Sequence, residues 1–322
     1  MPVFDMPLDQ LKKYQGINPR PRDFDLYWER AIQEMNESKS ELELIPANFQ
    51  APFADCFDLY FTGVRGARIH AKYLRPKNNA PHPALLQFHG YTMDSGDWID
   101  KLPYVAAGFA VFAMDCRGQG GLSEDTGGVK GNTHHGHIIR GLDDEPDNLL
   151  YRHIFLDTAQ LASIVMNLPE VDPKRIGAMG GSQGGALTIA CASLVPEIKR
   201  LAPVYPFLAD YKRVWEMDLA KDAYGELKEY FRRFDPRHER ENEIYTKLGY
   251  IDIQNLADRI KGKVLMATGL MDMICPPSTQ FAVYNKITAE KEMKIYPDFA
   301  HEHLPGFADI CFKFMMKLVD SN

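Results

Sequence analysis

The sequence predicts an α/β fold with a mostly parallel sheet and helices on both faces. Short apolar runs recur from Pro83 onward, helix-like patterns fall between most of them, and 45% of the 322 residues are hydrophobic, which suffices for one sizeable core. The expected strands are residues 84–88, 109–114, 175–179, 200–205, 264–268 and 293–296. No repeat or low-complexity linker divides the chain, so we expect a single domain over residues 1–322.

Composition and charge argue against several classes of protein. Lys and Arg number 37 against 44 Asp and Glu, and no basic stripe interleaved with aromatic residues is present, so nucleic acid is not an expected partner. The N-terminus lacks the basic and apolar regions of an export signal, and no apolar run reaches the roughly 18 residues of a membrane span. We therefore expect no membrane partner.

The five cysteines stand singly, without a Cys-x-x-Cys pair, and four of them lie in apolar segments. We expect reduced thiols in the core rather than disulfides. This favours a cytoplasmic location and gives no sign of a structural metal or another cofactor.

Two elements precede the first parallel strand. Asp23 is placed to cap a helix whose apolar residues recur at helical spacing, and we expect this stripe to pack in the core. These residues are Phe24, Tyr27, Trp28, Ile32 and Met35. Residues 55–75 then alternate in two runs that break at residues 63–67, which predicts a β-hairpin.

The alternation of strands and helices is interrupted over residues 206–260, where the chain is charged and aromatic and has no apolar strand run. We interpret this stretch as a helical insertion over the carboxyl ends of the strands, the edge at which α/β sheets bind ligands. A surface helical hairpin or an oligomer contact would have a similar composition, and the sequence leaves that alternative open. Residues 118–141, rich in glycine and histidine, are expected to form a long loop beside the same edge.

The pattern Gly180-x-Ser182-x-Gly184 stands between an apolar run and a helix-like segment. A serine on a strained turn from strand to helix leaves no room for side chains two residues away on either side, and glycine meets that requirement. The turn would present the Ser182 hydroxyl beside the N–H groups of a helix start, which suits acyl transfer. The plainer alternative is a glycine-rich turn with an incidental serine, because such short patterns occur by chance.

A nucleophilic serine needs a base and an acid that orients the base, and α/β-hydrolases carry them in the order Ser, Asp or Glu, His. Asp272 follows an apolar strand and a turn at Gly269, and His301 lies on the loop after the last predicted strand. The required order is therefore satisfied by Ser182, Asp272 and His301.

Competitors exist for both partners of the serine. His303 stands two residues beyond His301, but Glu302 is placed to fix the turn of His301, and His303 is expected to begin the terminal helix. Asp252 and Asp258 precede the strand in the charged stretch and are expected to be surface groups.

An oxyanion hole needs the backbone N–H after the nucleophile and another from the loop after an earlier strand. We expect these donors to be Gln183 and Tyr91, the latter following His89-Gly90. His89 has a plainer role open to it, that of a packed loop residue.

A third loop carries Arg117-Gly118-Gln119 after the predicted strand 109–114. Arg117 and Gln119 have two roles open to them, contact with substrate or hydrogen bonds that tie neighbouring catalytic loops together. We favour the second role.

In this order and spacing, the motifs resemble those of carbohydrate esterase family 7, the acetyl xylan esterases and cephalosporin C deacetylases. The resemblance is carried by Arg117-Gly118-Gln119, Gly180-Gly181-Ser182-Gln183-Gly184 and His301-Glu302. It covers nearly the whole chain, through residues 4–8, 88–91, 205–208, 269–272 and 296–297. The three motifs together are highly specific, whereas the serine motif alone is only moderately so.

The resemblance implies an α/β-hydrolase fold and a role for each matching position. Ser182 would be the nucleophile, with Asp272 and His301 as its partners. The main-chain amides of Tyr91 and Gln183 would form the oxyanion hole, and the Arg-Gly-Gln motif would give structural support.

The resemblance also implies a homohexamer built as a trimer of dimers, and deacetylation of short acetylated xylo-oligosaccharides and of cephalosporins. The chain departs from the family pattern at Ala300, where glycine is usual, and at His303. Both positions lie close to His301 in the chain and affect the conformation of its loop. The reaction class is therefore more secure than the substrate preference.

The sequence thus predicts a metal-free serine carboxylesterase, without cofactor, that removes acetyl groups from small sugar substrates through an acyl-enzyme. A peptidase of similar fold would share the triad, but such enzymes usually add a propeller or another cap that 322 residues cannot hold. A binding protein on a retired hydrolase fold would be expected to have a decayed triad, whereas all three residues are present.

Overall fold

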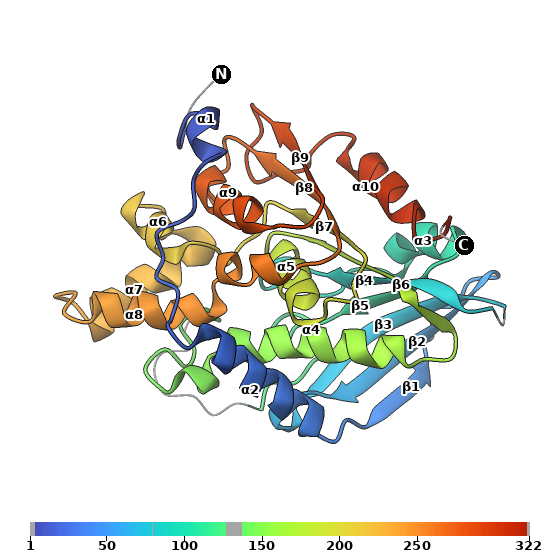
Figure 1. Ribbon diagram of the computed structural model, residues 1–322. Helices are drawn as coiled ribbons and strands as arrows, with labels where there is room; N and C mark the ends of the chain where they lie inside the picture. The colour runs from blue at the N-terminus through green and yellow to red at the C-terminus, as the bar shows by residue number, and fades with distance from the viewer. Residues whose placement is uncertain (1–3, 79, 127–136, 321–322) are drawn as a thin grey trace.

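The computed structural model describes residues 4–78, 80–126 and 137–320, and within them nine strands form one sheet (Figure 1). The strand order is β1-β2-β3-β5-β4-β6-β7-β8-β9. The pairs β1–β2, β2–β3 and β3–β5 are antiparallel, and the other pairs are parallel. The predicted, mostly parallel sheet is therefore confirmed. The strands are β1 (Leu42–Pro46), β2 (Ala54–Thr62), β3 (Arg68–Pro76), β4 (His82–Phe88), β5 (Ala110–Met114), β6 (Val171–Gly181), β7 (Arg200–Val204), β8 (Lys263–Gly269) and β9 (Lys291–Tyr296).

Helices cover both faces of the sheet (Figure 1). The α-helices are α1 (Leu8–Leu11), α2 (Phe24–Glu37), α3 (Leu102–Ala106), α4 (Leu150–Met166), α5 (Gln183–Leu194), α6 (Tyr211–Glu216), α7 (Gly225–Phe234), α8 (Glu241–Leu248), α9 (Pro277–Lys286) and α10 (Phe307–Met316). Alternate strand residues face the two layers, because side chains on a strand point to opposite faces in turn. Leu85 and Val111 pack with α3 and α10, whereas Leu86 and Phe112 pack with α2, α4 and α5.

Each predicted strand is present, and the hairpin expected over residues 55–75 is β2 with β3. Strand β1 is not predicted by the sequence pattern, because its five residues are all exposed at the sheet edge and so have no inward apolar face. The helix predicted after Asp23 is α2, but the expected side-chain cap is wrong. The Asp23 carboxylate instead accepts a hydrogen bond from the Tyr250 hydroxyl.

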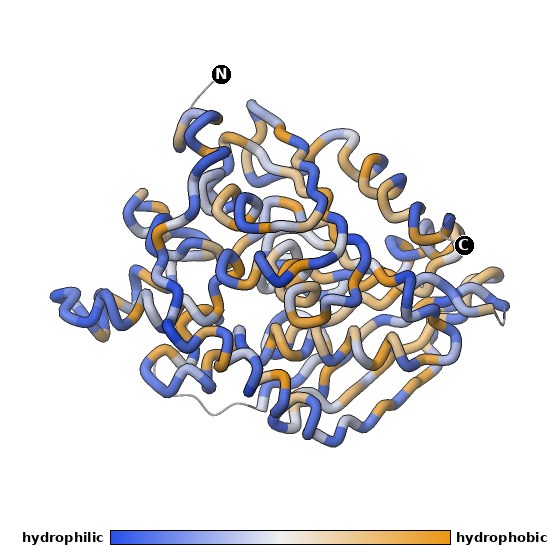
Figure 2. Tube along the Cα trace, viewed as in Figure 1, coloured by the Kyte–Doolittle hydropathy of each residue, from blue (hydrophilic) through white to orange (hydrophobic). Residues whose placement is uncertain are grey.

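Residues 206–260 form helices and no strand, as predicted. Besides α6, α7 and α8, they contain the short 3-10 helices η4 (Asp222–Tyr224), η5 (Gly249–Ile251), η6 (Ile253–Asn255) and η7 (Ala257–Arg259). The outer end of the α7–α8 pair is largely hydrophilic, while its inner side chains join the main core (Figure 2).

Asp252 is fully buried, so the expectation that it lies on the surface is wrong. Its carboxylate accepts hydrogen bonds from the backbone N–H groups of Asp210 and Gln254.

Two other expectations bear on the class of protein. The five cysteines are free and buried, as predicted for core thiols. The helices of the described part of the chain are all too short or too polar to cross a membrane.

The loop expected over residues 118–141 falls partly outside the described residues, and its described parts contain neither helix nor strand.

Candidate active site

Ser182 occupies the turn between β6 and α5 with a backbone conformation that L-residues rarely adopt. Its φ is 57° and its ψ is −118°. Such a conformation costs on the order of 1–3 kcal/mol and persists only where the surroundings enforce it. The Ser182 N–H donates to the Val204 carbonyl at 2.9 Å, and the Ser182 carbonyl accepts from Phe207 and Ala186 at 3.0 Å each. The strained turn is therefore held from β7 and from its own helix.

The two glycines that flank Ser182 at a distance of two residues are sterically required. A Cβ on Gly184 would lie 2.0 Å from the carbonyl oxygen of Phe88 in β4. A Cβ on Gly180 would lie 2.6 Å from the same oxygen and from the backbone of Gly184. Backbone atoms cannot move aside as a flexible side chain can, so the space constraint predicted from the sequence is confirmed.

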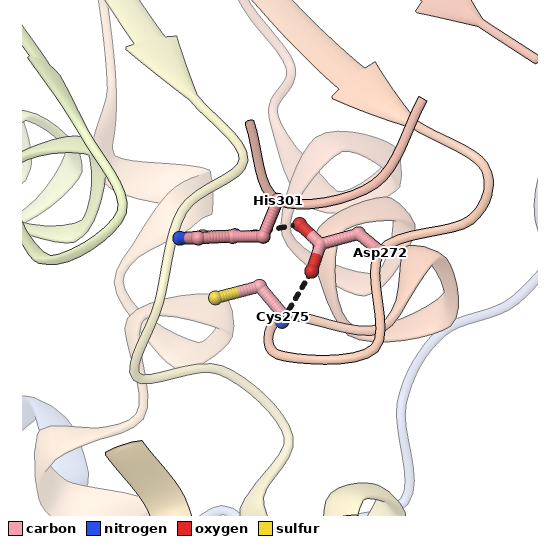
Figure 3. A group of neighbouring side chains, drawn as sticks. All are labelled: Asp272, Cys275 and His301. Atoms are coloured by element: carbon pink, nitrogen blue, oxygen red, sulfur yellow. Dashed lines mark hydrogen bonds and ion pairs between the residues drawn. The ribbon is translucent and has the colours of Figure 1, made fainter. Parts of the chain in front are cut away.

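His301 and Asp272 meet across the loops that follow β9 and β8. His301 Nδ1 lies 2.8 Å from Asp272 Oδ2, the distance of a charge-assisted hydrogen bond (Figure 3). Asp272 is fully buried, and its other oxygen accepts the backbone N–H groups of Ile274 at 2.9 Å and Cys275 at 2.8 Å. The carboxylate is thus fixed in place, and it in turn orients the imidazole ring.

The structure separates His301 from its competitor. His301 lines the same cavity as Ser182, whereas His303 is exposed and lines a different hollow beside α10. Glu302 accepts the backbone N–H of Ala300 at 3.0 Å, which is the turn-fixing role expected for it. His303 does not begin the terminal helix, because α10 starts at Phe307.

The cavity at Ser182 has a volume of about 560 Å³. Its walls are mostly apolar or aromatic, and Asp222 and Ala223 of the 206–260 segment form part of them. The Tyr205 ring packs against the His301 ring with centroids 4.4 Å apart. The lining residues are Gly90, Tyr91, Met93, Gly181, Ser182, Tyr205, Asp222, Ala223, Ile274 and His301.

The two expected oxyanion-hole residues lie beside Ser182. Tyr91 lines the cavity, and Gln183 is the first residue of α5, where N–H groups have no partner within the helix. The Gln183 side chain is fully buried and points into the protein instead. Its amide pairs reciprocally with that of Gln119, at 2.7 and 3.0 Å, and its oxygen also accepts the Tyr151 hydroxyl at 2.7 Å.

His89 is the packed loop residue that the sequence left open as its role. One ring nitrogen contacts the Gly90 carbonyl at 2.7 Å, and the other accepts the Cys116 backbone N–H at 2.9 Å. Burial lowers the pKa of His89, which favours the neutral ring that this pair of contacts requires.

The sequence and the fold of this chain are both similar to those of known proteins. A family model described as acetyl xylan esterase (AXE1) matches residues 1–318. The solved structure of acetyl xylan esterase 1 from Thermoanaerobacterium sp. JW/SL YS485 is 64% identical, with a TM-score of 0.97 over 98% of this chain and 99% of that one. The chain belongs to the acetyl xylan esterase family. Its resemblance to carbohydrate esterase family 7 is thereby confirmed.

Two less similar relatives are also described as acetyl esterases. The acetyl xylan esterase from Paenibacillus sp. R4 is 36% identical, with a TM-score of 0.91 over 97% of this chain and 99% of that one. Acetyl esterase Axe7A of Xylanibacter ruminicola is 28% identical over 318 residues, 91% of this chain and 69% of that protein. The family member described here is therefore a carboxylic ester hydrolase with the α/β-hydrolase fold, as the sequence predicted.

In this esterase Arg117 makes a fully buried ion pair. Its guanidinium donates to both oxygens of Asp157 in α4, at 2.7 and 2.6 Å, and to the carbonyl of Val64 at 3.2 Å. Gly118 has a φ of 69°, in the left-handed region, and Gln119 accepts the Thr92 backbone N–H at 2.9 Å. The hydrogen bonds of Arg117 join its loop to α4 and to Val64, and that of Gln119 joins it to Thr92. Sequence reasoning missed Asp157, which shows no pattern beyond lying in an apolar helix.

Glu226 is a second residue that sequence reasoning missed. It lies in α7, is only 3% exposed, and accepts the Tyr91 hydroxyl at 2.7 Å. Its other oxygen accepts the backbone N–H groups of Ile138 and Ile139 at 3.0 and 3.1 Å. Burial raises the pKa of Glu226 to about 7, although these hydrogen bonds favour the charged form. One signal was available, because Glu226 precedes the buried Tyr230 by one helical turn and so shares its face.

Replacement of Glu226 by Gln should change the pH dependence of stability. The Glu226 carboxyl keeps its proton up to about pH 7 in the folded esterase, whereas its ordinary pKa is 4.5. Between these two pH values the folded state binds more protons than the unfolded state, so the wild type loses stability relative to the variant as the pH rises from 4.5 to 7. The difference between their free energies of unfolding should shift by about 1–3 kcal/mol between pH 5 and pH 8. Urea unfolding of both proteins at the two pH values measures it, and a difference that does not change with pH would contradict the assignment.

Proposed function

We propose that this chain is a serine carboxylesterase that removes acetyl groups from small acetylated sugars, xylo-oligosaccharides in particular, and from cephalosporins. The observation that carries the proposal is the cavity shared by Ser182 and His301, with His301 hydrogen-bonded to the buried Asp272. The acetyl xylan esterases to which the chain is similar support the choice of acyl group. No nucleic acid, membrane or cofactor enters the proposal.

The reaction would proceed in two halves. Ser182 attacks the acetyl carbonyl while His301 Nε2 takes its proton, and Asp272 stabilises the imidazolium that forms. The backbone N–H groups of Tyr91 and Gln183 would hold the oxyanion of the tetrahedral intermediate. His301 then gives the proton to the departing sugar hydroxyl, which leaves an acetyl-enzyme. Water, activated by the same histidine, releases acetate.

The Arg-Gly-Gln motif would act in support of this machinery. Through Gln119 it ties the nucleophile helix to the loop that carries Tyr91, and through Arg117 it ties the same loops to α4. Asp222 and Ala223 of the 206–260 segment also line the cavity. We therefore propose one catalytic domain over residues 1–322, in which residues 206–260 shape access to Ser182.

Replacement of Ser182 by Ala should lower kcat by about 10⁴- to 10⁶-fold, because the nucleophile and its base act as a unit. His301→Ala should cause a loss of similar size, since the proton then has no acceptor. His303→Ala is the matched control and should retain the wild-type rate. Acetate release from acetylated xylobiose measures all three variants, and a Ser182→Ala variant with undiminished rate would exclude the serine mechanism.

The acyl group should be restricted to a short chain. Tyr91 and Tyr205 stand in the wall of the cavity beside Ser182, where a longer acyl group would meet them. The esterase should therefore hydrolyse p-nitrophenyl acetate at least about tenfold more efficiently than p-nitrophenyl octanoate. Comparison of kcat/KM for the two esters tests this, and equal values would contradict an acetyl-sized pocket.

We also propose a homohexamer built as a trimer of dimers. The family resemblance supports it, and so does β1, a sheet edge on which Leu42, Leu44 and Ile45 are 39–44% exposed. An open edge with exposed aliphatic side chains is suited to pairing with another chain.

Sedimentation should therefore find six-chain particles, and Leu44→Lys should shift them to smaller ones by placing a charge at the edge. Leu26→Lys, at an exposed position of α2, is the control and should leave the particle size unchanged. Identical sedimentation of the two variants would remove β1 from the proposed contact.

A cytoplasmic location is proposed on the chemistry of the cysteines. All five are free thiols inside the protein, and such thiols persist in a reducing compartment.

A further inference from the structure

Three chemically different metal ligands meet next to Ser182. The carboxylate of Asp272, the thiol of Cys275 and the imidazole of His301 each offer one atom, and these atoms lie within 4.8 Å of one another. Figure 3 shows the thiol and the imidazole on one side of the carboxylate. Among the residues that the structure describes, this is the one group of three or more His, Cys, Asp or Glu side chains close enough to hold an ion.

The position of the thiol is fixed by the turn that also fixes Asp272. The Cys275 backbone N–H donates to Asp272 at 2.8 Å, so the two residues cannot separate without loss of that bond. Burial raises the pKa of Cys275, the charge of Asp272 adds to this, and a hydrogen bond with Ser182 acts in the opposite direction. Ser182 therefore lies near the thiol, and it also lines the cavity.

The donor set matches the preferences of zinc. Zn²⁺ binds sulfur, imidazole nitrogen and carboxylate oxygen in tetrahedral sites whose ligand atoms lie roughly 3–4 Å apart. Atoms already within 4.8 Å of one another reach those separations by small side-chain shifts. A thiolate and a carboxylate would also balance the charge of a divalent cation, which a buried site requires. Hard cations such as Mg²⁺ prefer oxygen ligands and would not be favoured here.

An ion has a path to this group. Asp272 and Cys275 are fully buried, but His301 is 16% exposed through its side chain and lines the open cavity at Ser182. An ion in the cavity therefore meets His301 and Ser182 first and the other two ligands behind them.

We propose that Asp272, Cys275 and His301 form an inhibitory binding site for Zn²⁺ and similar soft divalent cations. On binding, the Cys275 thiol releases its proton to solvent as the sulfur–metal bond forms. If the ion binds at Nε2, that nitrogen can no longer accept the proton of Ser182. If it binds at Nδ1, the proton that Nδ1 donates to Asp272 is released to solvent and the hydrogen bond between the two residues is lost. That turnover then stops rests on the proposed role of His301, whereas binding itself does not.

Inhibition tests the site first. Chelator-treated enzyme is assayed with p-nitrophenyl acetate against increasing ZnCl₂, with MgCl₂ as a parallel series. Cys275→Ser should need at least about tenfold more Zn²⁺ than the wild type for half-inhibition, the loss typical even of partners outside the ligand sphere. Cys56→Ser, which changes a buried thiol in β2, is the matched control and should behave as the wild type. Equal Zn²⁺ sensitivity of Cys275→Ser and wild type would overturn the proposal.

Binding is measured separately with Co²⁺, whose bond to a thiolate produces a near-ultraviolet absorption band. The band should appear in the wild type and in Ser182→Ala, and it should be absent from Cys275→Ser. Should that variant fail to fold, as judged by circular dichroism, Cys275→Ala replaces it. A wild-type protein without the band overturns the site. A Ser182→Ala variant that retains both the band and full esterase activity supports the site and contradicts the serine mechanism.

Discussion

The close approach of helix α5 to the end of strand β4 sets the geometry of the region around Ser182. Only a residue without a side chain fits where Gly184 meets the Phe88 carbonyl, 2.0 Å from where a Cβ would be. Because the helix begins so close to the strand, the chain must turn sharply, and Ser182 takes a φ of 57°. The same approach brings the start of α5 beside the loop that carries Gly90 and Tyr91. The positions of the proposed nucleophile and of the two proposed backbone donors thus follow from one packing contact.

Buried polar pairs then hold the surrounding loops, and each pair joins segments far apart in the chain. Arg117 binds Asp157 of α4, Gln119 pairs with Gln183 of α5, and Tyr91 donates to Glu226 of α7. Polar groups taken out of water destabilise a fold unless their hydrogen bonds are satisfied, and inside a protein such bonds are stronger and more directional. These pairs therefore restrict the loops to one arrangement, which a site that acts by fixed geometry requires.

The Asp272 turn carries the geometry on which both the proposed serine mechanism and the proposed zinc site depend. Backbone N–H groups of Ile274 and Cys275 fix the carboxylate that orients His301. That geometry also leaves the Cys275 thiol within reach of the same imidazole. Orientation of a histidine by a buried carboxylate occurs both in catalytic sites and in metal sites. The proposed zinc sensitivity would be a side effect of that shared geometry.

The sequence alone determined the features that depend on local pattern: the strands other than β1, the glycines around Ser182, and the order of Ser182, Asp272 and His301. Periodicity and steric demand act between neighbours in the chain, so they can be read there. Tertiary structure alone decided which polar groups meet. Glu226 and Tyr91 are 135 residues apart, Asp252 is buried inside a charged segment, and Tyr250 takes the Asp23 carboxylate that α2 was expected to use. A polar residue carries no local sign of its distant partner, because that partner is chosen by the packing of whole helices and strands.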